Sequence, residues 1–202
     1  MVAGVILAAG RSQRMGRSKA LLGAPGGQTF VGRLVETLTK GGIDAPFVVG
    51  RADDEQLRTV VEALNPGARW IENLEADRGG QLSSVLAGLR RADRPGVRAL
   101  MVVPVDAPMI AVETVTKLAE VFSSTGAAIV RARYHGHNGH PVVFSRAVFD
   151  ELRRADPSMG AKAIVRAHEN TLVNVEVDDP GVIGDIDTPE EYERLLKTSG
   201  SG

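Results

Sequence analysis

The 202-residue sequence predicts an α/β protein, a three-layer α/β/α sandwich around a mostly parallel mixed sheet. Two observations predict this class. As far as Phe122, short apolar runs alternate with segments of helical spacing, an order typical of parallel sheets with right-handed crossovers. After that point two strand-like runs follow one another without a helix between them, which breaks the alternation.

The first half of the chain is predicted to supply strands and helices in turn. Val5-Ile6-Leu7 is aliphatic and largely β-branched, as expected of a buried parallel strand. Apolar residues recur at helical spacing over 30–39, and Gly41-Gly42 ends that helix. By the same criteria we expect strands at 46–49, 69–71 and 99–103, and helices at 57–64, 82–89 (after Gly79-Gly80) and 112–122.

The second half is predicted to contain a polar loop, residues 131–140, between strands at 127–130 and 141–144. Helices at 148–154 and 161–168, a strand at 172–177 and a helix at 190–196 follow. No internal repeat or long linker divides the sequence, and its length suits one core. We therefore expect a single domain at 1–198 and a disordered tail at 199–202.

Composition narrows the function. The net charge is −1 and the pI is about 6.4, which does not favour nucleic acid or an anionic membrane as a partner. The absence of Cys excludes disulfides, thiolate catalysis and Cys-ligated metal centres. No apolar stretch approaches the roughly 20 residues of a membrane span, and the first residues lack a basic signal-peptide region. We expect a cytoplasmic protein.

The most informative segment follows the first predicted strand. Residues 10–16 are bounded by Gly10 and Gly16, carry Arg11 and Arg14, and are followed by Lys19. Backbone N–H groups and cations at the carboxyl end of a parallel strand suit a polyphosphate. The glycine spacing fits neither the dinucleotide motif nor the P-loop. A basic surface turn is the alternative interpretation.

Two acidic segments follow later strands. Asp106 ends the run at 99–105 and has a proline two residues away on each side, at the sheet edge expected to hold the glycine loop. A carboxylate there suits Mg²⁺, which takes one or two carboxylates together with substrate phosphates; the alternative role is a turn or N-cap. In an extended 185–187 segment, Asp185 and Asp187 would share one face. Thr188 and Glu191 form a capping box, with Pro189 at the first helical position.

These motifs together resemble a known family. The string L-A-A-G-R-S-Q-R-M-G-x-x-K, residues 7–19, is similar to the signature of nucleotidyltransferases related to the molybdenum-cofactor guanylyl- and cytidylyltransferases. D-I-D-T-P-E at 185–190 resembles the closing motif of that family, although Glu191 replaces its last Asp. The resemblance implies a Rossmann-like nucleotide-diphospho-sugar transferase fold. The implied reaction moves a nucleoside monophosphate from an NTP to an acceptor phosphate and releases pyrophosphate.

The resemblance also assigns roles to residues. The implied catalytic residues are Arg11, Arg14, Lys19 and Asp106, and the implied Mg²⁺ ligands are Asp106 and Asp187, with Asp185 as the weaker alternative. The implied nucleotide-binding residues are Leu7, Ala8, Ala9, Gly10, Arg11, Lys19, Gly80, Gln81, Ser83 and Asp106. A plain helix N-cap is nearly as good an interpretation of the G-G-Q-L-S-S segment.

The acceptor is expected at His140 and Lys162. Residues 139–144 resemble the family's G-x-P-V-x-F strand beside the acceptor, and Lys162 stands where the family has Arg, so it lacks the bidentate fork. His135, His137 and His140 are close enough in the sequence to suggest a metal site, but a mobile, solvated loop is the favoured interpretation of this glycine-rich segment.

Within the family, the G-Q-L-S-S, G-H-P-V-V-F and D-I-D-T-P-E stretches resemble the cytidylyltransferase branch more than the guanylyl branch. This implies CTP rather than GTP as donor and molybdopterin as acceptor, with a molybdoenzyme or maturation factor as a further partner. The alternatives are an enzyme acting on a sugar phosphate or another small phosphorylated metabolite, and an inactive cofactor-binding chaperone. The combination of Lys19, Asp106 and Asp187 favours an enzyme.

Overall fold

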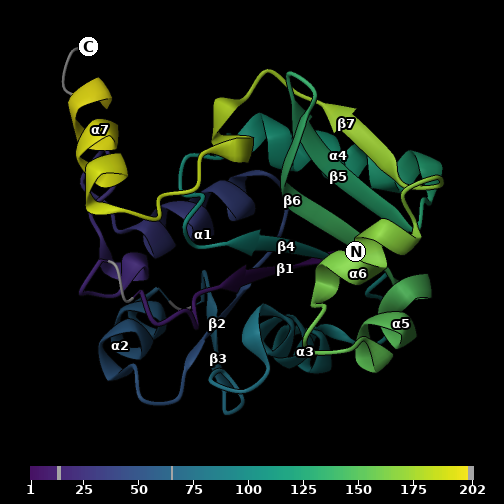
Figure 1. Cartoon of the computed structure of the whole chain (residues 1–202), viewed down its shortest axis with the longest axis horizontal. Coiled ribbons are helices and arrows are strands. Elements are labelled where there is room, and N and C mark those ends of the chain that lie inside the picture. Colours follow the sequence, from purple (N-terminus) through teal and green to yellow (C-terminus); the bar gives the residue numbers. More distant parts are fainter. Residues whose placement is uncertain (13–14, 65, 200–202) are drawn as a thin grey trace.

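Seven strands form one sheet in the order β3-β2-β1-β4-β6-β5-β7 within residues 1–12, 15–64 and 66–199, which the computed structural model describes (Figure 1). β6 is antiparallel to β4 and β5, and the other four pairings are parallel. The mostly parallel mixed sheet is therefore confirmed. The strands are β1 Val2–Leu7, β2 Phe47–Arg51, β3 Arg69–Asn73, β4 Ala99–Pro104, β5 Ile129–Tyr134, β6 His137–Ser145 and β7 Val173–Glu176.

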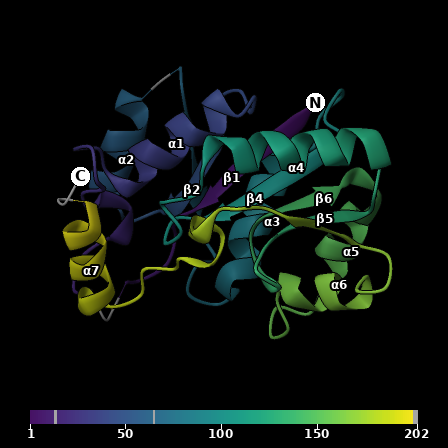
Figure 2. The ribbon, with the colours of Figure 1, turned by 90° about the horizontal axis from the view of Figure 1, so that it is seen from above.

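Helices cover both faces of this sheet. Figure 2 shows α1, α2 and α4 on one face and α3, α5 and α6 on the other, with α7 at one end. This is the predicted three-layer sandwich. The helices are α1 Phe30–Lys40, α2 Glu55–Ala63, α3 Gly80–Ala92, α4 Val112–Thr125, α5 Phe149–Arg154, α6 Ala161–Ala167 and α7 Pro189–Ser199; short 3₁₀ helices are η1 Lys19–Leu21, η2 Arg146–Val148 and η3 Pro180–Ile183. None of these helices is long and apolar enough to cross a membrane.

The two faces of the sheet build two apolar layers. Ile6 packs toward α1, whereas its neighbours Val5 and Leu7 pack toward α3, because strand side chains alternate. β4 is buried along its whole length, as expected for a central strand covered on both faces. Burial of this apolar surface is the main force that holds the carboxyl ends of β1 and β4 together.

The predicted polar loop at residues 131–140 is wrong for most of its length. β5 and β6 continue through it as a hairpin, in which Arg133 pairs with Asn138 and Tyr134 with His137. His135 and Gly136 form its two-residue turn, both at positive φ. The sequence did not predict these strand ends because their side chains are polar. The outer hairpin extends beyond the part of the sheet that helices cover, and strands there need not be apolar.

The three histidines of this hairpin do not converge. His135 and His137 are exposed, while His140 is largely buried against a cavity. Among the described residues, no group of three or more His, Cys, Asp or Glu side chains is placed to hold a metal. At the other end of the chain, Ser199, expected in the tail, is the last residue of α7. Residues 200–202 lie outside the described part.

Candidate active site

A cavity of about 540 Å³ opens at the carboxyl ends of β1 and β4. Most of the predicted nucleotide-binding residues line it together: Leu7, Ala8, Ala9, Gly10, Arg11, Lys19, Gly80, Gln81 and Asp106. Additional walls come from Ser12, Ala20, Ala76, Asp77, Ser84, Pro104, Val105 and Asp187. Arg14, a predicted catalytic residue, lies outside the described residues. The position agrees with the rule that open α/β sheets bind ligands beyond the carboxyl ends of their strands.

Lys19 joins two carboxylates in the wall of this cavity. Its Nζ lies 2.5 Å from Asp187 Oδ1 and 3.5 Å from Asp106 Oδ2. Its backbone N–H donates to Ser12 Oγ at 3.1 Å, which ties the first residue of η1 to the glycine loop. The side chain of Lys19 is only 13% exposed. Residues that are 87 and 168 positions apart in the chain from Lys19 therefore meet around one ammonium group.

The backbone holds Asp106 and Asp187 on neighbouring segments. Val105 N–H donates to the Leu7 carbonyl at 3.0 Å, which keeps the end of β4 beside β1. Ile186 N–H donates to the Asp106 carbonyl at 2.7 Å. Ile186 is buried, so Asp185 and Asp187 point to the opposite, exposed side of this segment, as its predicted alternation requires.

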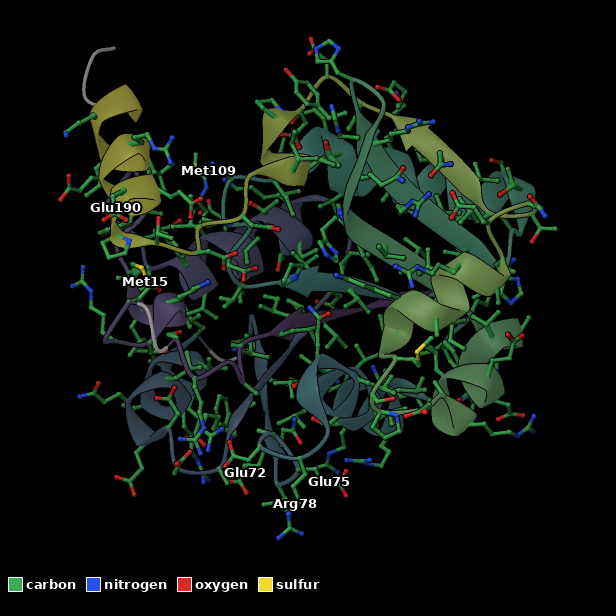
Figure 3. All side chains as sticks on the ribbon, viewed as in Figure 1. Met15, Glu72, Glu75, Arg78, Met109 and Glu190 are labelled. Carbon is green, nitrogen blue, oxygen red and sulfur yellow. The ribbon has the colours of Figure 1, made fainter. Side chains whose placement is uncertain are left out.

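The short helix η3 sets the position of that segment. The buried Asp179 caps it by accepting from Gly181 N–H and also accepts from Ala111 N–H and Thr114 Oγ1 at the start of α4. A Cβ on Gly181 would lie 2.3 Å from the Met109 carbonyl oxygen, so glycine is needed for this close approach. Met109 lies between η3 and α7 in Figure 3.

Three carboxylates repel one another here. Burial raises the pKa of Asp106, and the charge of Asp187 raises it further, while Lys19 opposes both effects. Burial also raises the pKa of Asp185, and the charges of Asp106 and Asp187 add to the increase. Two close carboxylates beside phosphate oxygens are a common way to hold Mg²⁺, which needs no cluster of three protein ligands. The donor set therefore fits a hard divalent cation that a nucleotide helps to bind.

Asp77, which the sequence did not single out, neutralises one cation of the glycine loop. Arg11 Nη2 lies 2.8 Å from Asp77 Oδ2, and Arg51 Nη1 lies 2.7 Å from Asp77 Oδ1. Hydrogen bonds from Arg51 and then Arg11 hold the pKa of Asp77 well below its usual range. Arg78, the next residue, extends away from the molecule (Figure 3). A triphosphate that recruits Arg11 must compete with Asp77.

Ser83, predicted to contact the nucleotide, does not line the cavity. It is buried, donates to the Gly80 carbonyl at 2.7 Å and accepts from Asn73 Nδ2 at 2.8 Å. Ser84 lines the cavity instead. Ser84 is also buried, and its Oγ accepts from Asn73 Nδ2 at 3.0 Å, so the same amide group holds both serines.

A second cavity of about 390 Å³ adjoins the first and shares Leu7 and Gln81 with it. His140, Lys162 and Asp185 line this cavity, whereas Asp187 lines the first. Burial, followed by the charge of Lys162, lowers the pKa of His140 to about 4, against a hydrogen bond with the Val102 backbone. His140 is therefore neutral at pH 7, and its buried Nδ1 has no partner among the described residues.

The sheet topology, the glycine loop and the paired carboxylates at one edge define a nucleotidyltransferase of the nucleotide-diphospho-sugar transferase fold. The profile of the "MobA-like NTP transferase domain" matches residues 4–172. The chain belongs to this family.

Comparisons with curated relatives and with solved structures support this family assignment. Over 200 residues the chain is 28% identical to the "Purine catabolism protein PucB" of Bacillus subtilis, covering 96% of this chain and 95% of PucB. It is 36% identical over 162 residues to a "Probable molybdenum cofactor guanylyltransferase" of Mycobacterium tuberculosis, covering 79% and 74% of the two chains. The crystal structure of M. tuberculosis Rv0371c matches with a TM-score of 0.80 at 28% identity and covers 97% of each chain. The manganese complex of Rv0371c matches with a TM-score of 0.77 at 28% identity and covers 98% of each chain.

Proposed function

We propose that this protein is a Mg²⁺-dependent enzyme that transfers CMP from CTP to the phosphate of a molybdopterin-type acceptor. The observation that carries the proposal is the meeting of Lys19, Asp106 and Asp187 in the wall of the cavity that the glycine loop also lines. A site that only binds a nucleotide does not need two carboxylates beside the phosphates of the nucleotide. A site that catalyses a reaction at the α-phosphate needs them to hold the metal ion.

The proposed reaction needs little covalent chemistry from the protein. An oxygen of the acceptor phosphate attacks the α-phosphorus, the bond to the β-phosphate bridging oxygen breaks, and pyrophosphate leaves with that electron pair. The attacking oxygen is already largely ionised near pH 7, so no general base is required. Alignment of the attacking and leaving groups, together with charge neutralisation, can then supply most of the rate acceleration.

The chain's own residues divide this work between the two cavities. Backbone N–H groups of the glycine loop would hold the triphosphate, with Arg11 released from Asp77 onto it. Lys19 would move from the carboxylates to the negative charge that develops on the leaving pyrophosphate. Asp106 and Asp187 would hold Mg²⁺, which when bound neutralises charge at the α-phosphate. His140 and Lys162 would hold the acceptor in the second cavity.

Two observations bear on the choice of nucleotide. The G-Q-L-S-S segment, which resembles that of cytidylyltransferases, contributes Gly80, Gln81 and Ser84 to the cavity, and this favours CTP. The name of the 36%-identical relative favours GTP, which is the second candidate. The same name supports a molybdopterin-type acceptor.

The test is a pyrophosphate-release panel. Wild-type protein with Mg²⁺ is assayed with each of the four NTPs against molybdopterin and several sugar phosphates. We expect release with CTP and molybdopterin, and a loss of at least about 100-fold in Asp106→Asn, because a ligand to the reacting centre is removed. Asp150→Asn, on the surface of α5, is the matched control and should retain full activity.

The outcomes separate the alternatives. Release with GTP alone changes the donor, and release only with a sugar phosphate changes the acceptor. Nucleotide binding without release under any condition would identify a cofactor-binding chaperone and would refute the proposed enzyme.

A further inference from the structure

The side chains that line the second cavity are more basic than acidic. Three cationic side chains line it, Arg131 on β5 and Lys162 and Arg166 on α6, against the single carboxylate of Asp185. Lys162 and Arg166 are one helical turn apart and both are exposed. Neither forms an ion pair with a carboxylate of the described residues.

The position of Arg131 is unusual for an arginine. It is 8% exposed in the wall of the cavity. Its Nε donates to Asn174 Oδ1 at 2.9 Å, and its Nη2 lies 3.0 Å from Glu169 Oε1. Among the described residues, nothing accepts from Nη1. A partly buried guanidinium with free donors at a cavity wall is well suited to bind an oxygen anion.

The strand register places Arg131 far from the reacting centre. Val102, Val142 and Arg131 lie in one row across β4, β6 and β5, and all three line the cavity. Asp106 lies beyond the end of β4 at Pro104, which is two residues further along. With about 3.3 Å per residue and about 4.8 Å between strands, the backbone positions of Arg131 and Asp106 are on the order of 10 Å or more apart. The cavity therefore extends well beyond the reacting centre, toward Arg131.

Apolar side chains make up much of the wall of this cavity. Val85, Val102, Val142, Phe144, Val165 and Val182 line the same cavity. An acceptor seated there would lay an uncharged body along this wall, between its reacting phosphate and the Arg131 end.

We propose that the acceptor is a phosphomonoester with a second, anionic group at its far end, bound by Arg131 with the help of Arg166. This inference rests on the proposed function for the orientation of the acceptor. Arg131 would then determine which acceptors the second cavity binds, in addition to connecting β5 to β7 through its hydrogen bond with Asn174.

The test uses a direct binding measurement that does not depend on turnover. The probes are a linear alkyl phosphonate that ends in a carboxylate and the same chain ending in a carboxamide. We expect the wild-type protein to bind the carboxylate about tenfold more tightly by calorimetry, the strength of a charge-assisted hydrogen bond. Arg131→Gln should remove this preference, and the exposed Arg166→Gln, which leaves the fold unaffected, should reduce it.

Arg133→Gln is the matched control, because Arg133 is on the same strand, donates to the Gly136 carbonyl and does not line the cavity. It should retain the preference. Equal binding of the two probes by wild-type protein, or a preference that survives both Arg131→Gln and Arg166→Gln, would overturn the inference.

Steady-state kinetics then tests whether the anion site at Arg131 affects turnover. Arg131→Gln should raise the KM for the acceptor about tenfold and leave the KM for the NTP unchanged, a separation that a merely structural role would not produce. If wild-type protein releases no pyrophosphate but still prefers the carboxylate probe, the proposed function fails while the anion site stands. If it turns over but shows no preference, only the present inference fails.

Discussion

At the scale of a single residue, the proposed metal-binding role of Asp106 conflicts with its surroundings, which disfavour a negative charge. As a carboxylate beside Asp187, it is suited to hold a cation, yet burial and that neighbour both raise its pKa. The folded metal-free protein therefore keeps the Asp106 proton to a higher pH than the unfolded chain does. The resulting stabilisation is complete below the unfolded value near 3.8 and is lost as the pH rises through the folded value.

This reasoning predicts that Asp106→Asn stabilises the metal-free protein at pH 7, because the neutral amide does not lose stability as the pH rises. We expect the Tm in the presence of a chelator to rise by a few degrees, since 1 kcal/mol shifts the Tm of a chain of this size by about 2–4 °C. At pH 4 the gain should shrink, because the wild-type carboxyl is then partly protonated. A lower Tm for Asp106→Asn at pH 7 would mean that the ion pair with Lys19 outweighs the cost of burial.

At the scale of elements, η3 is the part that brings the acidic segments together. Asp179 connects it to the start of α4, and Gly181 lets it approach the loop that follows Asp106. The α7 capping box then holds the other end of the segment, since Glu191 Oε2 accepts from the backbone N–H groups of Asp187 and Thr188. Asp185 and Asp187 are thus anchored on both sides.

We expect Gly181→Ala to lower the free energy of unfolding by about 1–3 kcal/mol, because its Cβ would lie against backbone atoms of Met109 and Ile110. Its pyrophosphate release should fall as well, since η3 must shift. Gly184→Ala is the control: its nearest contact would be 3.4 Å, so a change within about 0.5 kcal/mol is expected. Urea unfolding measures both variants, and equal losses would show that the close approach of η3 is unimportant.

At the scale of the whole molecule, one sheet with an apolar layer on each face carries both cavities. We propose that residues 1–198 act as a single domain, because β1 contributes to both layers and to both cavities. Leu7 and Gln81 line both cavities, so a donor in the first cavity and an acceptor in the second would meet beside these two residues.

Binding of the donor nucleotide to the folded domain should raise its Tm. A ligand present at 100 times its Kd stabilises the folded state by about 2.7 kcal/mol, which corresponds to a Tm increase of roughly 5–10 °C here. We expect this shift with CTP and Mg²⁺ and a smaller one with CTP and a chelator. An equal shift with and without Mg²⁺ would contradict the assignment of Asp106 and Asp187 as metal ligands.

Most elements could be predicted from the sequence because apolar periodicity is a local property. The helix at 30–39 and the strand at 99–103 are confirmed within one residue at each end, and the Thr188 capping box is confirmed by its hydrogen bonds. The outer hairpin could not be predicted, since its strand ends are polar and their pairing is decided by β7 and the turn at Gly136. Prediction fails here because the apolar alternation that marks a strand is too weak along these polar strand ends.

The same division holds at the site. The sequence by itself determined the glycine loop, the carboxylate at the end of β4 and the acidic segment before α7, because each depends on a short motif and on the common edge of parallel strands. Only the tertiary structure decided that Lys19 joins Asp106 to Asp187, that Asp77 holds Arg11, that Ser84 rather than Ser83 lines the first cavity, and that Asp185 and Asp187 line different cavities. These outcomes depend on side chains from segments far apart in the chain, and packing of the whole domain sets their distances.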